Sequence, residues 1–90
     1  MFRIFWSRQA SVELGRIRGV AHDRLLKRVE LLAEFPLLGS AMDGPYRGFR
    51  QFVVGRYRVI YQVAGREIRI AYIRHGARQL GLRLIGKDED

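Results

Sequence analysis

The spacing of apolar positions changes once along the chain, near Pro36–Pro45. Before this segment, apolar residues recur every three or four positions, which is typical of one face of a helix. After it, apolar and polar residues alternate, which is typical of half-buried strands. The pattern therefore predicts a helical first half and a stranded second half.

The first half begins with alternation over residues 2–6, which predicts a short strand. Ser7 suits a helix N-cap, because its hydroxyl can accept a hydrogen bond from a free backbone N–H. Two helices should follow, over 8–18 and 21–34, with a break near Gly19–Val20 because glycine weakens a helix. Residues 38–45 should form a loop. The apolar stripe that predicts the helices is Ala10, Leu14, Ile17, Ala21, Leu25, Val29 and Leu32.

The second half predicts three strands, over 49–54, 57–63 and 68–75, joined by close turns at 55–56 and 64–66. Such short connections force antiparallel neighbours. Strict alternation groups the side chains of the second strand into Tyr57, Val59, Tyr61 and Val63 against Arg58, Ile60 and Gln62. In the third strand it groups Ile68, Ile70 and Tyr72 against Arg69, Ala71, Ile73 and His75.

The order βααβββ predicts an α+β domain in which an N-terminal strand and an αα-hairpin pack on a small antiparallel sheet. The helices should cover one face, and the other should be exposed and rich in arginine. We expect a single domain over 1–86 and a frayed acidic tail over 87–90.

Composition narrows the function classes. Ninety residues with no Cys, two His and nine carboxylates make a dedicated metal or cofactor site improbable. No apolar run approaches the roughly 18 residues that a membrane span needs. We therefore expect a cytoplasmic protein without a membrane partner.

The charge points to an anionic partner. The net charge is +8, and only Lys27 and Lys87 are lysines among seventeen bases. Arg47 to Arg83 contains nine Arg and one acid, Glu67. Because a guanidinium can bind phosphate or carboxylate through two hydrogen bonds, this half predicts contact with nucleic acid or an acidic protein. The alternative is a solvated basic face without a specific partner.

The residues from Gly48 to Leu80 carry a family resemblance. The strand Tyr57-Arg58-Val59-Ile60-Tyr61, the later Ile70-x-x-Ile73-x-His75-Gly76-x-Arg78 and the helix end Leu32-x-x-x-Pro36-x-x-Gly39 resemble the RelE/ParE superfamily of bacterial toxins. The resemblance covers residues 4–80 and implies a toxin neutralised by a small acidic cognate antitoxin. Contacts with partners are expected at Arg47, Arg50, Arg58, Arg69, Arg74, Arg78 and Arg83.

The superfamily contains two mechanisms. RelE-like members cut mRNA in the ribosomal A site, and ParE-like members poison DNA gyrase. Of the cations implied for a nuclease, Arg58 and Arg78 match the pattern, Arg50 matches loosely, and the C-terminal Tyr is absent. Proton transfer would depend on His75, because a histidine side chain can serve as either an acid or a base near neutral pH. This incomplete catalytic set and the ending His75-Gly76-Ala77-Arg78 favour the ParE-like branch, and a basic nucleic-acid-binding module is the remote alternative.

Two of these residues also have structural interpretations. His75 could instead end its strand with a hydrogen bond to a backbone carbonyl. Arg58 lies mid-strand, where a charge is costly unless it is paired, so it could form a salt bridge with Glu67 or a helix carboxylate rather than bind a phosphate or a partner's acid.

Overall fold

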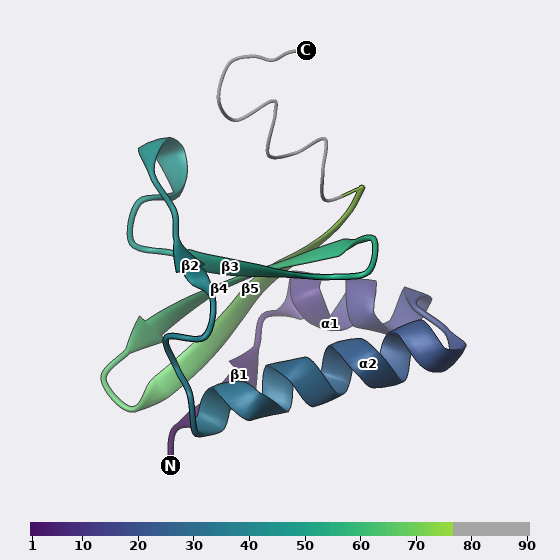
Figure 1. Ribbon diagram of the computed structural model, residues 1–90, viewed down its shortest axis with the longest axis horizontal. Helices are drawn as coiled ribbons and strands as arrows, with labels where there is room; N and C mark the ends of the chain where they lie inside the picture. Colours follow the sequence, from purple (N-terminus) through teal and green to yellow (C-terminus); the bar gives the residue numbers. More distant parts are fainter. Residues whose placement is uncertain (77–90) are drawn as a thin grey trace.

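The computed structural model describes residues 1–76, which form two helices packed on one face of a five-stranded sheet (Figure 1). The elements, in chain order, are β1 (Arg3–Trp6), α1 (Arg8–Arg16), α2 (Gly19–Glu30), the 3₁₀ turn η1 (Leu31–Ala33), β2 (Ser40–Ala41), the 3₁₀ turn η2 (Gly44–Tyr46), β3 (Arg50–Val54), β4 (Tyr57–Ala64) and β5 (Glu67–His75).

The helices follow the predicted hairpin with shifted bounds. Ser7 caps α1 as expected, its hydroxyl accepting a hydrogen bond from the Ala10 N–H. The break lies at Ile17–Arg18, where the backbone is extended, and α2 begins at Gly19 with φ 65° rather than at residue 21. Neither helix of residues 1–76 is long and apolar enough to cross a membrane.

The sheet has the order β1-β5-β4-β3-β2. The predicted α+β class is confirmed, and β3, β4 and β5 are antiparallel neighbours as expected. However, β1 pairs with β5 in parallel, so the whole sheet is mixed. The predicted loop over 38–45 also contains β2, which pairs with the start of β3. The chain between β1 and β5 contains both helices and three further strands, and this long connection allows β5 to lie beside β1 in the same direction.

A β-bulge at Ala71 corrects the predicted alternation of β5. Ile60 pairs with Tyr72, whereas the next residue, Tyr61, pairs with Ile70, so β5 has one extra residue. Beyond the bulge the faces exchange. Tyr72 therefore lies on the face away from the helices, and Ile73 turns into the core.

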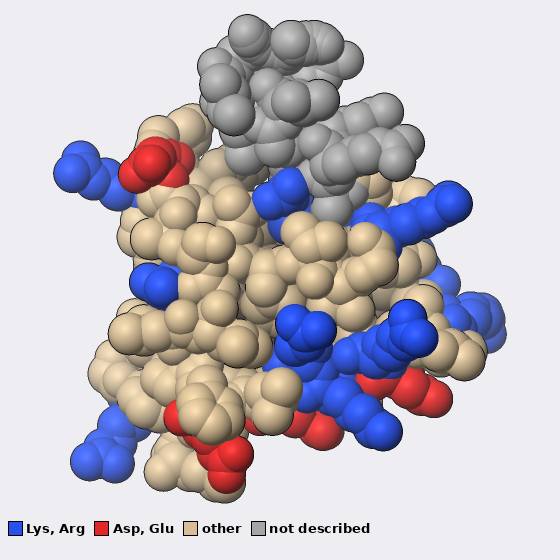
Figure 2. Space-filling view, viewed as in Figure 1, with Lys and Arg blue, Asp and Glu red and all other residues tan. Residues whose placement is uncertain are grey.

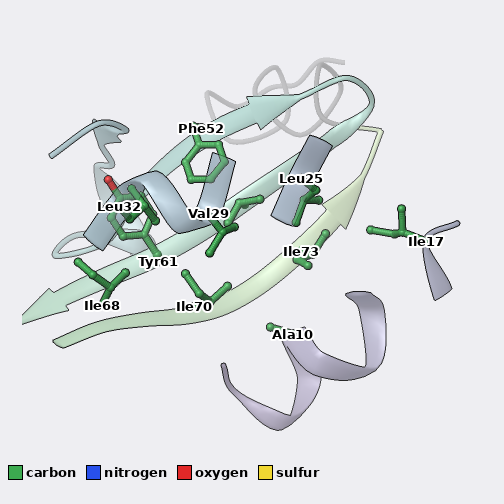
Figure 3. Close-up of a cluster of buried hydrophobic side chains, with 11 residues drawn as sticks. Ala10, Ile17, Leu25, Val29, Leu32, Phe52, Tyr61, Ile68, Ile70 and Ile73 are labelled. Atoms are coloured by element: carbon green, nitrogen blue, oxygen red, sulfur yellow. The ribbon is translucent and has the colours of Figure 1, made fainter. Parts of the chain in front are cut away.

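The core lies between the helices and the sheet (Figure 3). Leu25 and Val29 of α2 pack against strand residues such as Val59 and Ile70, all of them fully buried. Burying each such aliphatic side chain stabilises the fold by about 1.5–3 kcal/mol. The opposite face is not exposed throughout as predicted, because Ile60 has no exposed surface and Arg58 has only 7%.

Buried Tyr61 also holds the segment after the helices. Its hydroxyl accepts a hydrogen bond from the Gly39 N–H (2.9 Å) and donates one to the Pro36 carbonyl (2.8 Å). A Cβ on Gly39 would lie 2.5 Å from the Gln51 carbonyl oxygen, so only glycine fits this close approach.

Candidate functional site

Two arginines lie directly opposite each other on the sheet face away from the helices. Arg58 of β4 pairs in register with Arg74 of β5. Like charges at such positions destabilise a sheet, but two adjacent guanidinium groups can share one anion. The pair is therefore the strongest candidate in the described part of the chain for binding a phosphate or a carboxylate.

Arg58 is the buried member of the pair, with 7% of its surface exposed. Its guanidinium donates a hydrogen bond to the Gln51 side-chain oxygen on β3. Burial lowers the pKa of Arg58 from its ordinary value, because removing the cation from water disfavours the charged form. Arg58 therefore places a partly desolvated positive charge beneath the surface of this face.

Arg74 is the more accessible member. Its guanidinium carbon lies 4.6 Å from the centre of the Tyr72 ring, a cation–π contact that orients the side chain along the sheet. Among residues 1–76, no carboxylate forms a salt bridge with Arg74. Its hydrogen-bonding capacity is therefore available to an anion that approaches this face.

The salt bridge between Arg58 and Glu67, one of the structural alternatives for Arg58, is not formed. Glu67 begins β5, opposite Ala64 at the far end of the hairpin, and its carboxylate accepts hydrogen bonds from Arg69 at 2.9 and 3.1 Å. Arg69 is thus held by an intramolecular ion pair at the opposite end of β5 from Arg74.

His75 lies on the opposite face from the arginine pair. It pairs in register with Tyr57, and the two rings make an edge contact with centres 5.1 Å apart. The expected hydrogen bond from His75 to a backbone carbonyl is not found within residues 1–76. The strand end is closed instead by the Gly76 N–H, which donates to the Arg56 carbonyl at 2.8 Å.

Arg50 also lies away from the arginine pair. Its guanidinium donates hydrogen bonds to the Gly39 carbonyl at 2.6 and 2.9 Å, so it fastens the segment before β2. Arg47 is exposed beside η2. Arg78 and Arg83, like the predicted tail over 87–90, lie outside the described residues. Among residues 1–76, the structure thus brings together only Arg58 and Arg74 of the predicted set.

A second basic surface was not predicted. Arg24, Lys27 and Arg28 are exposed on one side of α2, and Figure 2 shows blue side chains gathered over this helix. They border a shallow groove of about 720 Å³ between α2 and the β3–β4 turn. The spacing of these bases along the helix could have indicated a basic helix face. The groove itself could not be predicted, because it forms between segments that are distant in sequence. Its lining is Arg24, Lys27, Arg28, Glu30, Leu31, Val53, Val54 and Gly55.

Comparison with known proteins places this geometry in a family. The family described as ParE toxin of type II toxin–antitoxin system, parDE, matches residues 4–80. No curated protein matches significantly. Solved structures with the same fold include the chromosomal ParDE toxin–antitoxin system from P. aeruginosa, with a TM-score of 0.69 and 20% identity over 83% of this chain and 96% of that one. The intact E. coli RelBE toxin–antitoxin complex has a TM-score of 0.72 and 15% identity, over 83% of this chain and 96% of that one. The isolated E. coli RelE toxin has a TM-score of 0.70 and 15% identity, over 94% of this chain and 99% of that one.

Proposed function

This chain belongs to the ParE toxin family and is the toxin of a type II toxin–antitoxin system, and from that premise we propose that it inhibits growth by poisoning DNA gyrase. In this proposal a small acidic cognate antitoxin neutralises it. No step of the proposed activity requires a cofactor, because the toxin acts by binding.

One observation carries the choice of mechanism. His75, the residue best suited to proton transfer, lies on the opposite sheet face from Arg58 and Arg74. A ribonuclease must place its acid or base within about 3 Å of the reacting oxygen while cations hold the phosphate. The sequence after residue 76 contains neither His nor Tyr. This separation supports binding without catalysis.

Arg74 is the residue that we propose to contact the target, with Arg58 adding positive charge from beneath. The cation–π contact with Tyr72 orients the Arg74 guanidinium before any partner binds, which reduces the entropy lost on binding. Arg74→Ala should therefore reduce toxicity strongly. Arg3→Ala is the matched control, because Arg3 lies at the other end of the sheet, over the Phe5 ring.

The alternative is a RelE-like mRNA endonuclease. It is favoured by the Arg58–Arg74 pair, since adjacent guanidinium groups suit the phosphate of a cleavage transition state. The solved structures of the same fold include RelE toxins as well as a ParE toxin. In this alternative, Arg74 would hold the scissile phosphate of a message in the ribosomal A site.

Two assays separate the mechanisms. Purified toxin should convert supercoiled plasmid to linear DNA in the presence of gyrase, and it should leave the message on programmed ribosomes intact. Folded His75→Gln should stay fully toxic, because no proton is transferred. A-site cleavage by the wild type that His75→Gln abolishes, by about 10²–10⁴-fold in rate, would replace the gyrase proposal with the nuclease.

The proposed antitoxin is supported by charge. The net charge of +8 favours rapid, salt-sensitive association with an acidic protein. The solved ParDE and RelBE relatives are toxin–antitoxin systems. Expression of the chain from its native locus should recover a small acidic protein at a fixed stoichiometry. Recovery of the chain alone would contradict this part of the proposal.

A further inference from the structure

We propose that the groove between α2 and the β3–β4 turn receives an acidic, extended segment of the antitoxin, which adds as a strand to the outer edge of β3. This inference rests on the antitoxin of the proposed function and names the surface that it occupies. The groove lies beside α2, whereas the Arg58–Arg74 pair lies on the face away from the helices, where Arg58 pairs in register with Val53.

The edge of β3 supplies the backbone groups. Within residues 1–76, β2 pairs only with Arg50 and Gln51, so the rest of β3 has no outer strand neighbour. In the two-residue hairpin, Val54 and Tyr57 form the closing pair. Hydrogen-bonded pairs alternate with non-hydrogen-bonded ones. The N–H and C=O of Val53 therefore point away from β4, and an added strand can pair with them.

The side chains around the groove define the occupant. Arg24, Lys27 and Arg28 line it with a single carboxylate, Glu30, so its lining carries a net charge of +2. Leu31 is 43% exposed at the same groove. Three cations beside exposed apolar surface match a peptide that alternates carboxylates with apolar side chains. Nucleic acid matches less well, because it would leave the apolar surface uncovered.

The continuation of α2 extends the apolar surface. The Phe35 N–H donates to the Leu31 carbonyl, so Phe35 lies one turn beyond Leu31 on the same side. Phe35 is 56% exposed. A segment that leaves the edge of β3 can therefore continue along α2 onto apolar side chains.

The test measures affinity for the antitoxin that co-purifies from the native locus, using folded variants of the full chain. Arg24→Glu with Lys27→Glu should weaken binding at least about tenfold, because carboxylates of the partner lose their cations. Arg8→Glu, an exposed residue of α1 outside the groove, should change affinity less than about twofold.

A second pair of variants tests strand addition. Val53→Pro removes the outward N–H without breaking the β3–β4 ladder, since proline is tolerated on an edge strand. It should weaken binding about as much as the charge reversal, whereas Val53→Thr keeps the donor and should bind normally. In the wild-type complex, amide exchange of Val53 should slow by at least about tenfold, because its N–H becomes hydrogen-bonded.

The outcomes separate this inference from the proposed function. A stable complex whose affinity is unchanged by both the charge reversal and Val53→Pro overturns the groove assignment and leaves the antitoxin standing. Weakened binding without slower exchange at Val53 overturns strand addition. If the charge reversal abolishes binding to nucleic acid but not to the antitoxin, the assigned occupant is wrong. Failure of the wild type to recover a partner overturns the antitoxin and the groove assignment together.

Discussion

The hydroxyl of Tyr61 provides a sharp test of how the fold holds the segment after the helices. Tyr61→Phe removes one oxygen that accepts from the Gly39 N–H and donates to the Pro36 carbonyl. Both Tyr61 and Gly39 are buried, so the Gly39 N–H would lose its partner without gaining water. Two neutral hydrogen bonds and one stranded donor together correspond to about 2–3 kcal/mol of unfolding free energy.

Urea denaturation followed by circular dichroism measures this loss of unfolding free energy. On heating, the same loss should lower the melting temperature of a domain of this size by roughly 10–20 °C. Tyr72→Phe is the matched control, because the Tyr72 hydroxyl makes no hydrogen bond within residues 1–76 and the ring under Arg74 is retained. The control should lie within about 0.5 kcal/mol of the wild type. A Tyr61→Phe protein as stable as the control would refute the argument that this hydroxyl anchors the loop.

Three further substitutions test neighbouring contacts. Gly39→Ala should cost about 1–3 kcal/mol in urea denaturation, since its Cβ would meet the Gln51 carbonyl oxygen at 2.5 Å; unchanged stability would mean that the strand yields easily. Arg50→Ala should cost about 1–2 kcal/mol, because the Gly39 carbonyl loses its guanidinium donors, and toxicity per folded molecule should persist. Ser7→Ala removes the cap of α1 and the donor to the Ala71 carbonyl, which should cost about 1–2 kcal/mol and speed amide exchange in α1; normal protection there would contradict the capping role.

Local signals were enough to predict most of the fold. The period of apolar residues identifies the helix hairpin and the three longer strands, because each element must bury one face. The glycines between the alternating runs predicted the two tight turns, and Gly55 and Gly65 indeed have positive φ of 60° and 62°. Ser7 could be predicted as an N-cap because its hydroxyl bonds a backbone N–H only three residues later, a local interaction.

The remaining features depend on contacts between distant segments. The parallel pairing of β1 with β5 joins residues about sixty positions apart and leaves no local mark. Arg50 was predicted as a partner or catalytic cation. Its hydrogen bonds to the Gly39 carbonyl could not be inferred from its position in a strand. The groove beside α2 is likewise formed by segments about thirty positions apart.

The bulge at Ala71 links the fold directly to the question of mechanism. The Ser7 N–H donates to the Ile70 carbonyl at 2.9 Å and its hydroxyl to the Ala71 carbonyl at 2.7 Å, so the start of α1 holds the extra residue in place. If Ala71 instead paired in regular alternation, without a bulge, every later side chain in β5 would lie on the other face. His75 would then share a face with Arg58, as a nuclease requires, and Arg74 would turn toward the helices. The bulge at Ala71 thus determines which side chain of β5 shares a face with Arg58, and in this structure that side chain is Arg74 rather than His75.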